Sequence, residues 1–285
     1  MTIEAAHSGA DTNRFGVELH FECELEQLGE LGPRFIPSEL DPEGEAFLAG
    51  ALRRNHTRAG YWAHRALTLL LSDFDANALL GMYPVFLFST PQAQALLEAA
   101  RPGGVRDDRW LDVGAGSGDV TTRLSPLVES IACTEVSRFM ARRLRQRGFQ
   151  CWRGRLGEGA PGDPLASEVP FDGISLFNVI DRASKPRSLL RAVARHLPPQ
   201  GLLMLSTPLP YDPFFYAGSV THEPEEKLRV DASTWEGAVS QLWRNELAPL
   251  GLELAALTRM PYLSGGDVHY PAYVLDAAVL VCRKR

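Results

Sequence analysis

The stretch LDVGAGSG, residues 111–118, decides the fold. It has the arrangement D-x-G-x-G-x-G, formed by Asp112, Gly114, Gly116 and Gly118. Glycines let the backbone turn sharply after a strand and approach a ligand closely. A dinucleotide fingerprint, G-x-G-x-x-G, would need its third glycine where this chain has Asp119. The pattern therefore argues against a bound pyrophosphate, and the acids that flank the loop favour a cationic or amine-bearing ligand.

A further acidic residue, Glu135, lies seventeen residues beyond Gly118, at the end of the next apolar segment. At the end of the second strand of such a fold, an acid accepts two ribose hydroxyls. The loop, the acid before it and Glu135 together resemble the S-adenosylmethionine site of the class I (Rossmann-like) methyltransferases. The alternative is a tight strand–helix turn followed by a surface glutamate.

Outward from the loop, seven segments have the length and apolar character of strands. They lie within residues 109–119, 130–137, 149–154, 171–181, 201–209, 252–263 and 272–284. Helices are predicted at 45–56, 60–74, 89–100 with Ser89 as N-cap, 137–148, 188–201 and 235–247. Strands that alternate with helices form a parallel, doubly wound sheet. We therefore predict an α/β fold with a seven-stranded, mostly parallel sheet and helices on both faces.

The rest of the chain divides into an N-terminal part and an insertion. Residues 1–45 are acidic and interrupted by Gly and Pro, which indicates a loosely ordered arm or lid, although Phe35 and Ile36 are apolar enough to dock. Residues 46–100 are predicted to form an N-terminal helical cap. Residues 101–285 form the methyltransferase domain, with an insertion at 208–250 that is longer than a plain crossover requires.

Composition excludes several classes of protein. The net charge of −6 gives no basic field for a phosphate backbone, so no nucleic-acid partner is expected. The arginine-rich run at 138–147 is interpreted as the solvated face of one helix. Four scattered cysteines give no metal-ligand spacing, so no metal is predicted. No signal peptide or membrane-spanning run is seen, and an intracellular, cytoplasmic location is expected.

The fourth predicted strand ends in two polar residues, Asn178 and Asp181. This end of the strand faces the transferred methyl in the class I fold. Enzymes that methylate nucleobase amines or a glutamine amide have two prolines and an aromatic residue here, and this chain has neither. An amide with a carboxylate suits a nucleophile that carries an N–H. The alternative is that Asp181 caps the next helix, although Ser184 is better placed to do so.

Longer motifs resemble one family, the methyltransferase-like protein 9 (DREV) family of protein-histidine methyltransferases. The resemblance covers roughly residues 65–283. It rests on five motifs: NALLGMYPVFLFSTPQAQALL (77–97), LDVGAGSGDVT (111–121), CTEVS (133–137), NVIDR…P (178–186) and RMPYLSGGD…YVLDAAVLV (259–281). The family transfers a methyl group from S-adenosylmethionine to the pros nitrogen, Nδ1, of histidines in His-x-His motifs of proteins, and S-adenosylhomocysteine is the other product.

The resemblance also implies roles for residues. The cofactor would be bound by Asp112, Gly114, Gly116, Gly118, Glu135 and Asn178. Substrate-binding residues would be Asn178, Asp181, Tyr262 and Tyr273, of which Asp181 and Tyr273 would be catalytic. The alternative for both tyrosines is a place in the core as strand aromatics. The region 153–164 does not obviously match the segment expected to contact adenine.

Elementary chemistry fits histidine as the acceptor. An imidazole with a pKa of about 6.5 is mostly neutral at pH 7, so a nitrogen lone pair is available without a strong base. If Asp181 accepts the Nε2–H, the Nδ1 lone pair faces the methyl group; the reverse tautomer would give tele methylation instead, and pros selectivity is implied by the resemblance alone. Two other functions stay open: a small-molecule N- or O-methyltransferase of the same fold, and a catalytically silent adaptor.

Overall fold

The computed structural model of the chain describes residues 17–53, 84–154, 170–217, 220–265 and 272–285, together with Trp62 and Leu156. Several predicted features lie outside this description. They are the helix at 60–74 apart from Trp62, the middle of the helical cap, and most of the region expected near adenine.

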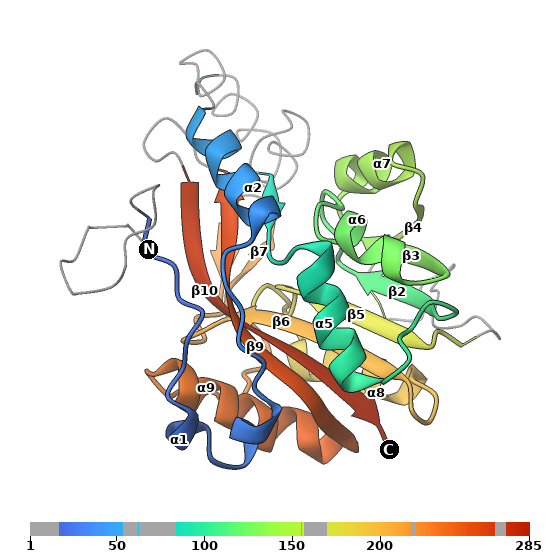
Figure 1. Cartoon of the computed structure of the whole chain (residues 1–285). Helices are drawn as coiled ribbons and strands as arrows, with labels where there is room; N and C mark the ends of the chain where they lie inside the picture. Colours follow the sequence, from blue (N-terminus) through green and yellow to red (C-terminus); the bar gives the residue numbers. More distant parts are fainter. Residues whose placement is uncertain are drawn as a thin grey trace.

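The centre of the molecule is one sheet with the strand order β1–β9–β10–β6–β5–β2–β3–β4 (Figure 1). All seven predicted strands are confirmed, and the short β1 makes an eighth: β1 (Val85–Phe86), β2 (Arg109–Val113), β3 (Ser130–Glu135), β4 (Gln150–Arg153), β5 (Gly173–Phe177), β6 (Leu202–Pro208), β9 (Leu252–Gly265) and β10 (Ala272–Lys284). Strands β2 to β6 pair in parallel, whereas β10 pairs antiparallel with both β6 and β9. The central strands are continuous apolar runs because both faces of the sheet are covered.

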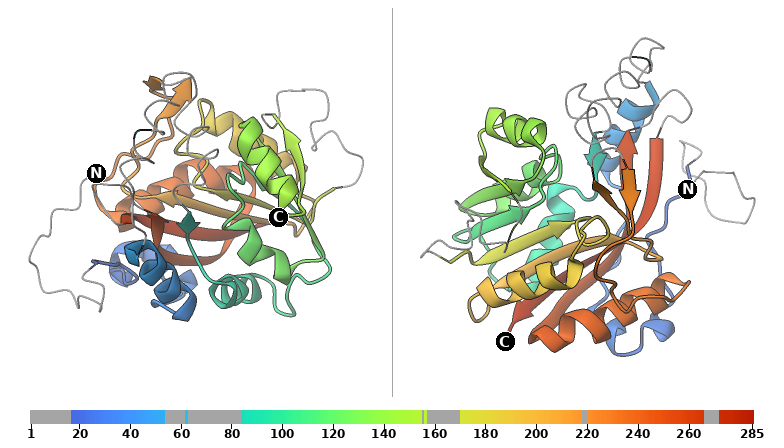
Figure 2. Two further views of the ribbon diagram at one scale, coloured as in Figure 1. Left: turned by 90° about the horizontal axis from the view of Figure 1, so that it is seen from above. Right: turned by 180° about the vertical axis from the view of Figure 1, so that it is seen from behind.

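Helices cover both faces of the sheet, as predicted (Figure 2). On one face lie α5 (Thr90–Ala100), α6 (Thr121–Leu124) and α7 (Arg138–Gln146), with the 3-10 turn η2 (Ser125–Leu127). On the other face lie α8 (Pro186–His196) and α9 (Trp235–Leu242). Ser89 caps α5 as expected: its Oγ accepts the Gln92 N–H, and in return the Gln92 side chain accepts the Ser89 N–H. This is the mostly parallel α/β architecture that the sequence predicts.

The N-terminal segment does not behave throughout as a loose arm. Residues 25–34 form α1 (Leu25–Leu28) and a 3-10 turn, η1 (Gly29–Arg34), and bury Leu28 and Leu31 in the core beside α9. Phe35 pairs with Leu257, so docking of this part of the segment is confirmed. The expectation of loose order fails here because two buried leucines outweigh the Gly- and Pro-rich composition around them.

The next helix, α2 (Pro42–Arg53), packs on the far end of the β9–β10 hairpin through Leu48, Phe86 and Leu263. The hairpin is longer than the strand beside it. Strand β6 ends opposite Ala277, whereas the pairing of β9 with β10 continues to Ala272. The end of the hairpin therefore rises past the carboxyl edge of the sheet (Figure 1).

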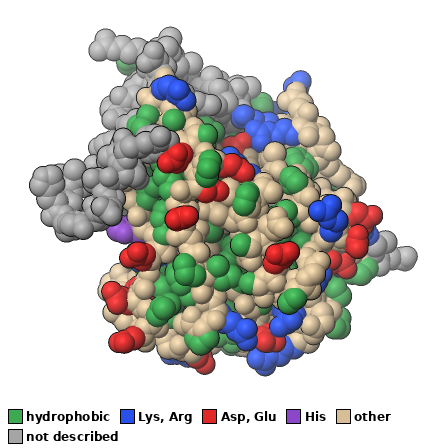
Figure 3. Space-filling model, viewed as in Figure 1, with side chains coloured by type: hydrophobic (Ala, Val, Ile, Leu, Met, Phe, Trp, Pro, Cys, Tyr) green, Lys and Arg blue, Asp and Glu red, His purple; other side chains and the backbone are tan. Residues whose placement is uncertain are grey.

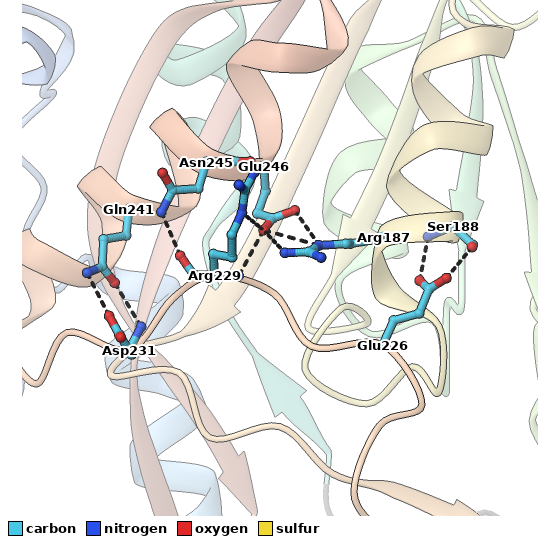
Figure 4. Close-up of polar contacts among 8 residues, drawn as sticks. All are labelled: Arg187, Ser188, Glu226, Arg229, Asp231, Gln241, Asn245 and Glu246. Atoms are coloured by element: carbon cyan, nitrogen blue, oxygen red, sulfur yellow. Dashed lines mark hydrogen bonds and ion pairs between the residues drawn. The ribbon is translucent and has the colours of Figure 1, made fainter.

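The predicted insertion contains a small antiparallel pair, β7 (Phe215–Ala217) and β8 (Val220–His222). Beyond it comes the helix predicted at 235–247, which is α9 continued by a π-helical turn at Trp243–Leu247 and a 3-10 turn at Ala248–Leu250. Polar contacts fasten the intervening chain to α8 and to this helix (Figure 4). The residues involved are Arg187, Ser188, Glu226, Arg229, Asp231, Gln241, Asn245 and Glu246.

Basic and acidic side chains are interspersed on the face seen in Figure 3, with no single-sign field across it. Within the residues described, no helix has the length and apolar character needed to cross a membrane.

Candidate active site

The glycine loop that follows β2 has the geometry predicted for it. Gly114, Gly116 and Gly118 have φ values of 69°, 55° and 79°, the left-handed region that favours glycine. A Cβ at Gly114 would lie 2.9 Å from Val179, and one at Gly118 would lie 2.7 Å from Leu144. A Cβ at Gly116 would meet no atom within 4 Å. Two glycines are therefore needed for packing, while Gly116 faces the open space where a ligand would lie.

Asp112 lies beneath this loop rather than at its surface. It is buried, and its two carboxylate oxygens accept hydrogen bonds from Thr121 Oγ1 at 2.5 Å and Ser175 Oγ at 2.7 Å. Burial raises the pKa of Asp112 to about 6, against the effect of these two bonds. The residue thus ties β2 to β5 and to the first turn of α6, which fixes the loop between them.

Glu135 ends β3 beside the same loop. Its carboxylate accepts the backbone N–H of Gly116 and that of Ser137, each at 2.9 Å. The side chain of this glutamate is therefore aimed at the edge of the glycine loop, where the ribose of a cofactor was expected.

Asp119 joins the loop to the chain that leads into β1. It accepts hydrogen bonds from Val85 N–H at 3.2 Å and Ser117 Oγ at 2.7 Å, and it pairs with Arg147 at 2.6 Å. These partners hold the pKa of Asp119 below its ordinary value, although burial opposes them. Its carboxylate is thus committed to partners within the chain.

Asn178 follows β5 with a φ of 54°, a conformation that asparagine tolerates better than most residues. Its backbone N–H donates to the carbonyl oxygen of Ser206 at 3.0 Å, and its Oδ1 accepts from Ser206 Oγ at 2.7 Å. Its Nδ2 is buried and makes no hydrogen bond of good geometry among the described residues, although the Asn178 side chain lies near enough to that of Tyr262 to influence the pKa of the tyrosine. A positive φ and a poorly satisfied donor are features expected of a ligand-binding position.

Asp181 is 2% exposed, yet only one of its carboxylate oxygens is paired. Oδ2 lies 2.8 Å from Arg182 Nη1, whereas Oδ1 has no partner among the described residues. Burial raises the pKa of Asp181, and the charge of Arg182 opposes this. A buried acceptor that lacks a donor is costly, and an N–H or O–H donor brought to this oxygen would remove that cost.

The helix-capping alternative for Asp181 is wrong. Helix α8 begins at Pro186 with Lys185 as its N-cap, and Lys185 makes no side-chain capping bond; the Glu226 carboxylate accepts the Ser188 N–H in the first turn instead, at 2.8 Å. Ser184, which the sequence favoured as the cap, does not fill that role either. Proline at the first position removes one of the donors that a cap would satisfy.

Tyr262 and Tyr273 share one face of the β9–β10 hairpin. Tyr262 lies opposite Leu275 and Tyr273 lies opposite Ser264, so the two tyrosines are diagonal neighbours across the pair. Both are half-buried. Burial, followed by the charges of Asp181 and Asp119, raises the pKa of Tyr262, and a side-chain interaction with Asn178 acts in the opposite direction. Tyr262 therefore lies near the polar residues that follow β5. Its side chain also packs against the core.

The sequence did not single out several residues that complete this site. Ser206 of β6 holds Asn178, Tyr211 donates its hydroxyl to the carbonyl of Ile180 at 2.9 Å, and the Phe214 N–H donates to the carbonyl of Asp181 at 3.0 Å. Ser206 gave a weak signal as a polar residue near the end of an apolar strand. The other two are aromatic residues in the insertion, where no pattern distinguishes them.

Within the described part of the chain, no cluster of three or more His, Cys, Asp or Glu residues is arranged to hold a metal ion. The site thus consists of a glycine loop, a glutamate beside it, and a half-paired aspartate whose charge acts on Tyr262.

Comparison with known proteins gives one family match. The model of the family described as DREV methyltransferase matches residues 20–284.

Several solved structures have a similar backbone fold. The N-methyltransferase NodS from Bradyrhizobium japonicum, in complex with S-adenosylhomocysteine, has 13% identity, covers 68% of this chain and 86% of its own, and has a TM-score of 0.42. Magnesium protoporphyrin IX methyltransferase from Synechocystis, with bound S-adenosylmethionine, has 12% identity, covers 69% and 79%, and also has a TM-score of 0.42. A methyltransferase of Haloferax volcanii, solved with the activator Trm112, has 15% identity, covers 74% and 97%, and has a TM-score of 0.45. The assignment that follows rests on the family match and not on these likenesses.

Proposed function

Because the chain belongs to the DREV methyltransferase family, we propose that it transfers a methyl group from S-adenosylmethionine to the pros nitrogen of histidine in His-x-His motifs of proteins. Methyl transfer follows from the family. The choice of histidine as acceptor, and of Nδ1 within it, is the proposal.

The residues around the glycine loop fit S-adenosylmethionine, which supplies an electrophilic methyl group on a sulfonium. Gly116 leaves open space over the loop, and Glu135 stands at its edge to accept the ribose hydroxyls. Gly114 and Gly118 would hold the cofactor by letting the loop lie close to Val179 and Leu144. Asp112 supports the site from below, because both its oxygens bond to hydroxyls of the chain.

The single observation that carries the choice of acceptor is Oδ1 of Asp181, a buried oxygen without a partner in the described structure. A neutral imidazole offers one N–H and one lone pair on opposite sides of its ring. If Asp181 accepts the Nε2–H, the tautomer is set and the Nδ1 lone pair points away from the carboxylate. The aspartate thus fixes which ring nitrogen carries the proton, and the assignment of that proton to Nε2 comes from the family.

The same carboxylate also has a role after transfer. The methylated ring is an imidazolium, and a buried negative charge beside it stabilises the positive charge that develops. Asp181 can then take the Nε2 proton and leave a neutral methylhistidine. No strong base is needed, since a histidine side chain with a pKa of about 6.5 is mostly neutral at pH 7.

The neighbouring residues orient the ring. Asn178, at the junction of cofactor and substrate, has a buried Nδ2 without a hydrogen bond of good geometry, and Ser206 holds its amide near Tyr262. Tyr262 and Tyr273 line one face of the hairpin above, where an aromatic ring would stack or meet their hydroxyls.

The test uses the purified protein, labelled S-adenosylmethionine and two peptides. One peptide carries Ala-His-Ala-His repeats, and in the other alanine replaces those histidines. Acid hydrolysis followed by chromatography separates pros- from tele-methylhistidine. Pros-methylhistidine from the first peptide alone supports the proposal. Tele-methylhistidine refutes the assignment to Nδ1, and no transfer despite cofactor binding directs the search to small-molecule acceptors.

A further inference from the structure

Asp181 is followed by an arginine whose side chain folds back onto it. Arg182 Nη1 lies 2.8 Å from Asp181 Oδ2 and donates to the backbone carbonyl of Asp181 at 2.9 Å. The guanidinium is thereby held on the side of the carboxylate that faces away from the unpaired Oδ1.

A second contact holds the guanidinium from the other side. Its carbon lies 3.8 Å from the centre of the Phe214 ring, within the range of a cation–π interaction. The ring itself is placed by the bond from Phe214 N–H to the carbonyl of Asp181 and by an edge contact with Tyr216. Arg182 is therefore clamped between a residue of the β5–α8 loop and a residue of the insertion.

We propose that Arg182 is a positioning residue, which with Phe214 fixes the Asp181 carboxylate so that Oδ1 faces the substrate as an ionised acceptor. This inference rests on the proposed function, because it assigns the orientation of the group that binds the acceptor. It also gives the insertion a role, since Phe214 brings that segment into contact with the site.

The charges around Asp181 explain why one cation matters. Three ionisable groups of the described structure act on it or respond to it: Arg182 from its own loop, Tyr211 from the insertion and Tyr262 from β9. Burial raises the pKa of both tyrosines, so neither carries charge between pH 6 and 8. Burial also raises the pKa of Asp181, and Arg182 is the cation that opposes this rise.

The experiment measures kcat/KM for the His-x-His peptide between pH 5.5 and 9 in Arg182→Gln, Arg182→Lys and the unmodified protein. Loss of the cation raises the pKa of Asp181, so protonation removes the acceptor at a higher pH. In Arg182→Gln we expect the fall of kcat/KM on the acid side of the pH profile, its acid limb, to occur about one pH unit or more higher. At pH 7 its kcat/KM should be at least tenfold lower than that of the unmodified protein. The substrate histidine also titrates in this range, but it does so equally with every variant.

Arg182→Lys keeps the charge but lacks the planar fork that pairs with the carboxylate and stacks on Phe214. It should lower kcat/KM at all pH values while leaving the acid limb within a few tenths of a unit. Lys185→Gln is the matched control, because it removes an exposed cation three residues away that pairs with Glu225. Its profile should equal that of the unmodified protein.

Binding of S-adenosylhomocysteine and thermal unfolding confirm that each variant is folded. If Arg182→Gln does not fold, Phe214→Leu takes its place, since it releases the guanidinium from the ring and should lower kcat/KM at least threefold. An unshifted acid limb in a folded Arg182→Gln, or full activity of Phe214→Leu, overturns the inference. Failure of the unmodified protein to methylate the peptide overturns the proposed function, and this inference with it.

Discussion

Two buried carboxylates, Glu246 in the polar network that fastens the insertion and Asp181 after β5, differ in how they are satisfied. Glu246 accepts from Arg187 Nε and Nη2 at 3.1 and 2.9 Å and from the Arg229 N–H at 2.8 Å (Figure 4). Asp181 has one oxygen paired with Arg182 and one without a partner in the described structure.

Burial acts in the same direction on both carboxyl groups, yet their pKa values are shifted in opposite directions. Burial opposes ionisation of both groups, but the donors around Glu246 outweigh it and lower the pKa of that residue. At Asp181 the single cation is insufficient, and the pKa is raised. A fully paired buried carboxylate joins parts of the fold, whereas a half-paired one keeps a bonding site for something else.

The largest expected effect is on turnover in Asp181→Ala. Loss of the acceptor should lower kcat for the peptide by about 10²- to 10⁴-fold. Stability should change by less than about 1 kcal/mol, because removing a half-satisfied charge offsets the lost packing. Kinetics and thermal unfolding measure these two quantities, and calorimetry with S-adenosylhomocysteine should show nearly unchanged affinity for the cofactor. Asp107→Asn, at an exposed position, is the control, and unimpaired turnover in Asp181→Ala would exclude that residue from the mechanism.

Glu246→Ala should give the opposite pattern. Removing the acceptor of two arginines should lower the free energy of unfolding by about 3 kcal/mol, the lower end for a broken buried pair, because Arg187 can turn toward water. Turnover per folded molecule should fall less than tenfold. Denaturant titration measures the first quantity. Glu223→Ala, which breaks an exposed pair with Lys227, should change stability by less than about 0.5 kcal/mol. Equal losses of stability in Glu246→Ala and Glu223→Ala would show that the buried pairing of Glu246 does not stabilise the fold.

Glu135 tests whether a paired carboxylate can also bind a ligand. It accepts two backbone N–H groups, and we nevertheless propose that it binds the cofactor. Glu135→Ala should weaken the binding of S-adenosylhomocysteine about 10- to 100-fold, the value of one or two hydrogen bonds to a charged group. Calorimetry measures this, with Glu129→Ala, at an exposed position just before β3, as the control. Unchanged affinity would mean that Glu135, like Glu246, only joins parts of the fold.

The smallest effect concerns Asp112, whose two oxygens are both paired but only by neutral hydroxyls. Its pKa of about 6 lies above the unfolded value, so the folded protein binds the proton more tightly. Its contribution to stability is therefore greatest below pH 4 and is lost as pH rises to about 6. The Asp112→Asn protein lacks this titrating group and should not show the loss. Between pH 4 and 7, its free energy of unfolding should therefore change by about 2 kcal/mol less than that of the unmodified protein. Parallel stability–pH curves for the two proteins would refute it.

Much of the fold was predictable from the sequence because its causes are local. Strand and helix periods, the glycine spacing at 114–118 and the Ser89 cap depend on residues a few positions apart. Glu135 and Asp181 could be found because parallel strands bring their carboxyl ends to one edge of the sheet. Docking of residues 25–34 was missed, since a Gly- and Pro-rich composition conceals the two leucines that are buried there.

By itself, then, the sequence determined the α/β architecture and the glycine loop after the first strand of the fold, and it predicted Asn178 and Asp181 as the residues that meet the acceptor. Only the tertiary structure decided which oxygen of Asp181 is left unpaired, because that depends on Arg182 and on Phe214 from the insertion. It also decided that Ser206 holds Asn178 and that Tyr262 and Tyr273 share one face of a hairpin. These contacts join residues far apart in sequence, and their geometry arises from packing, which no local pattern records.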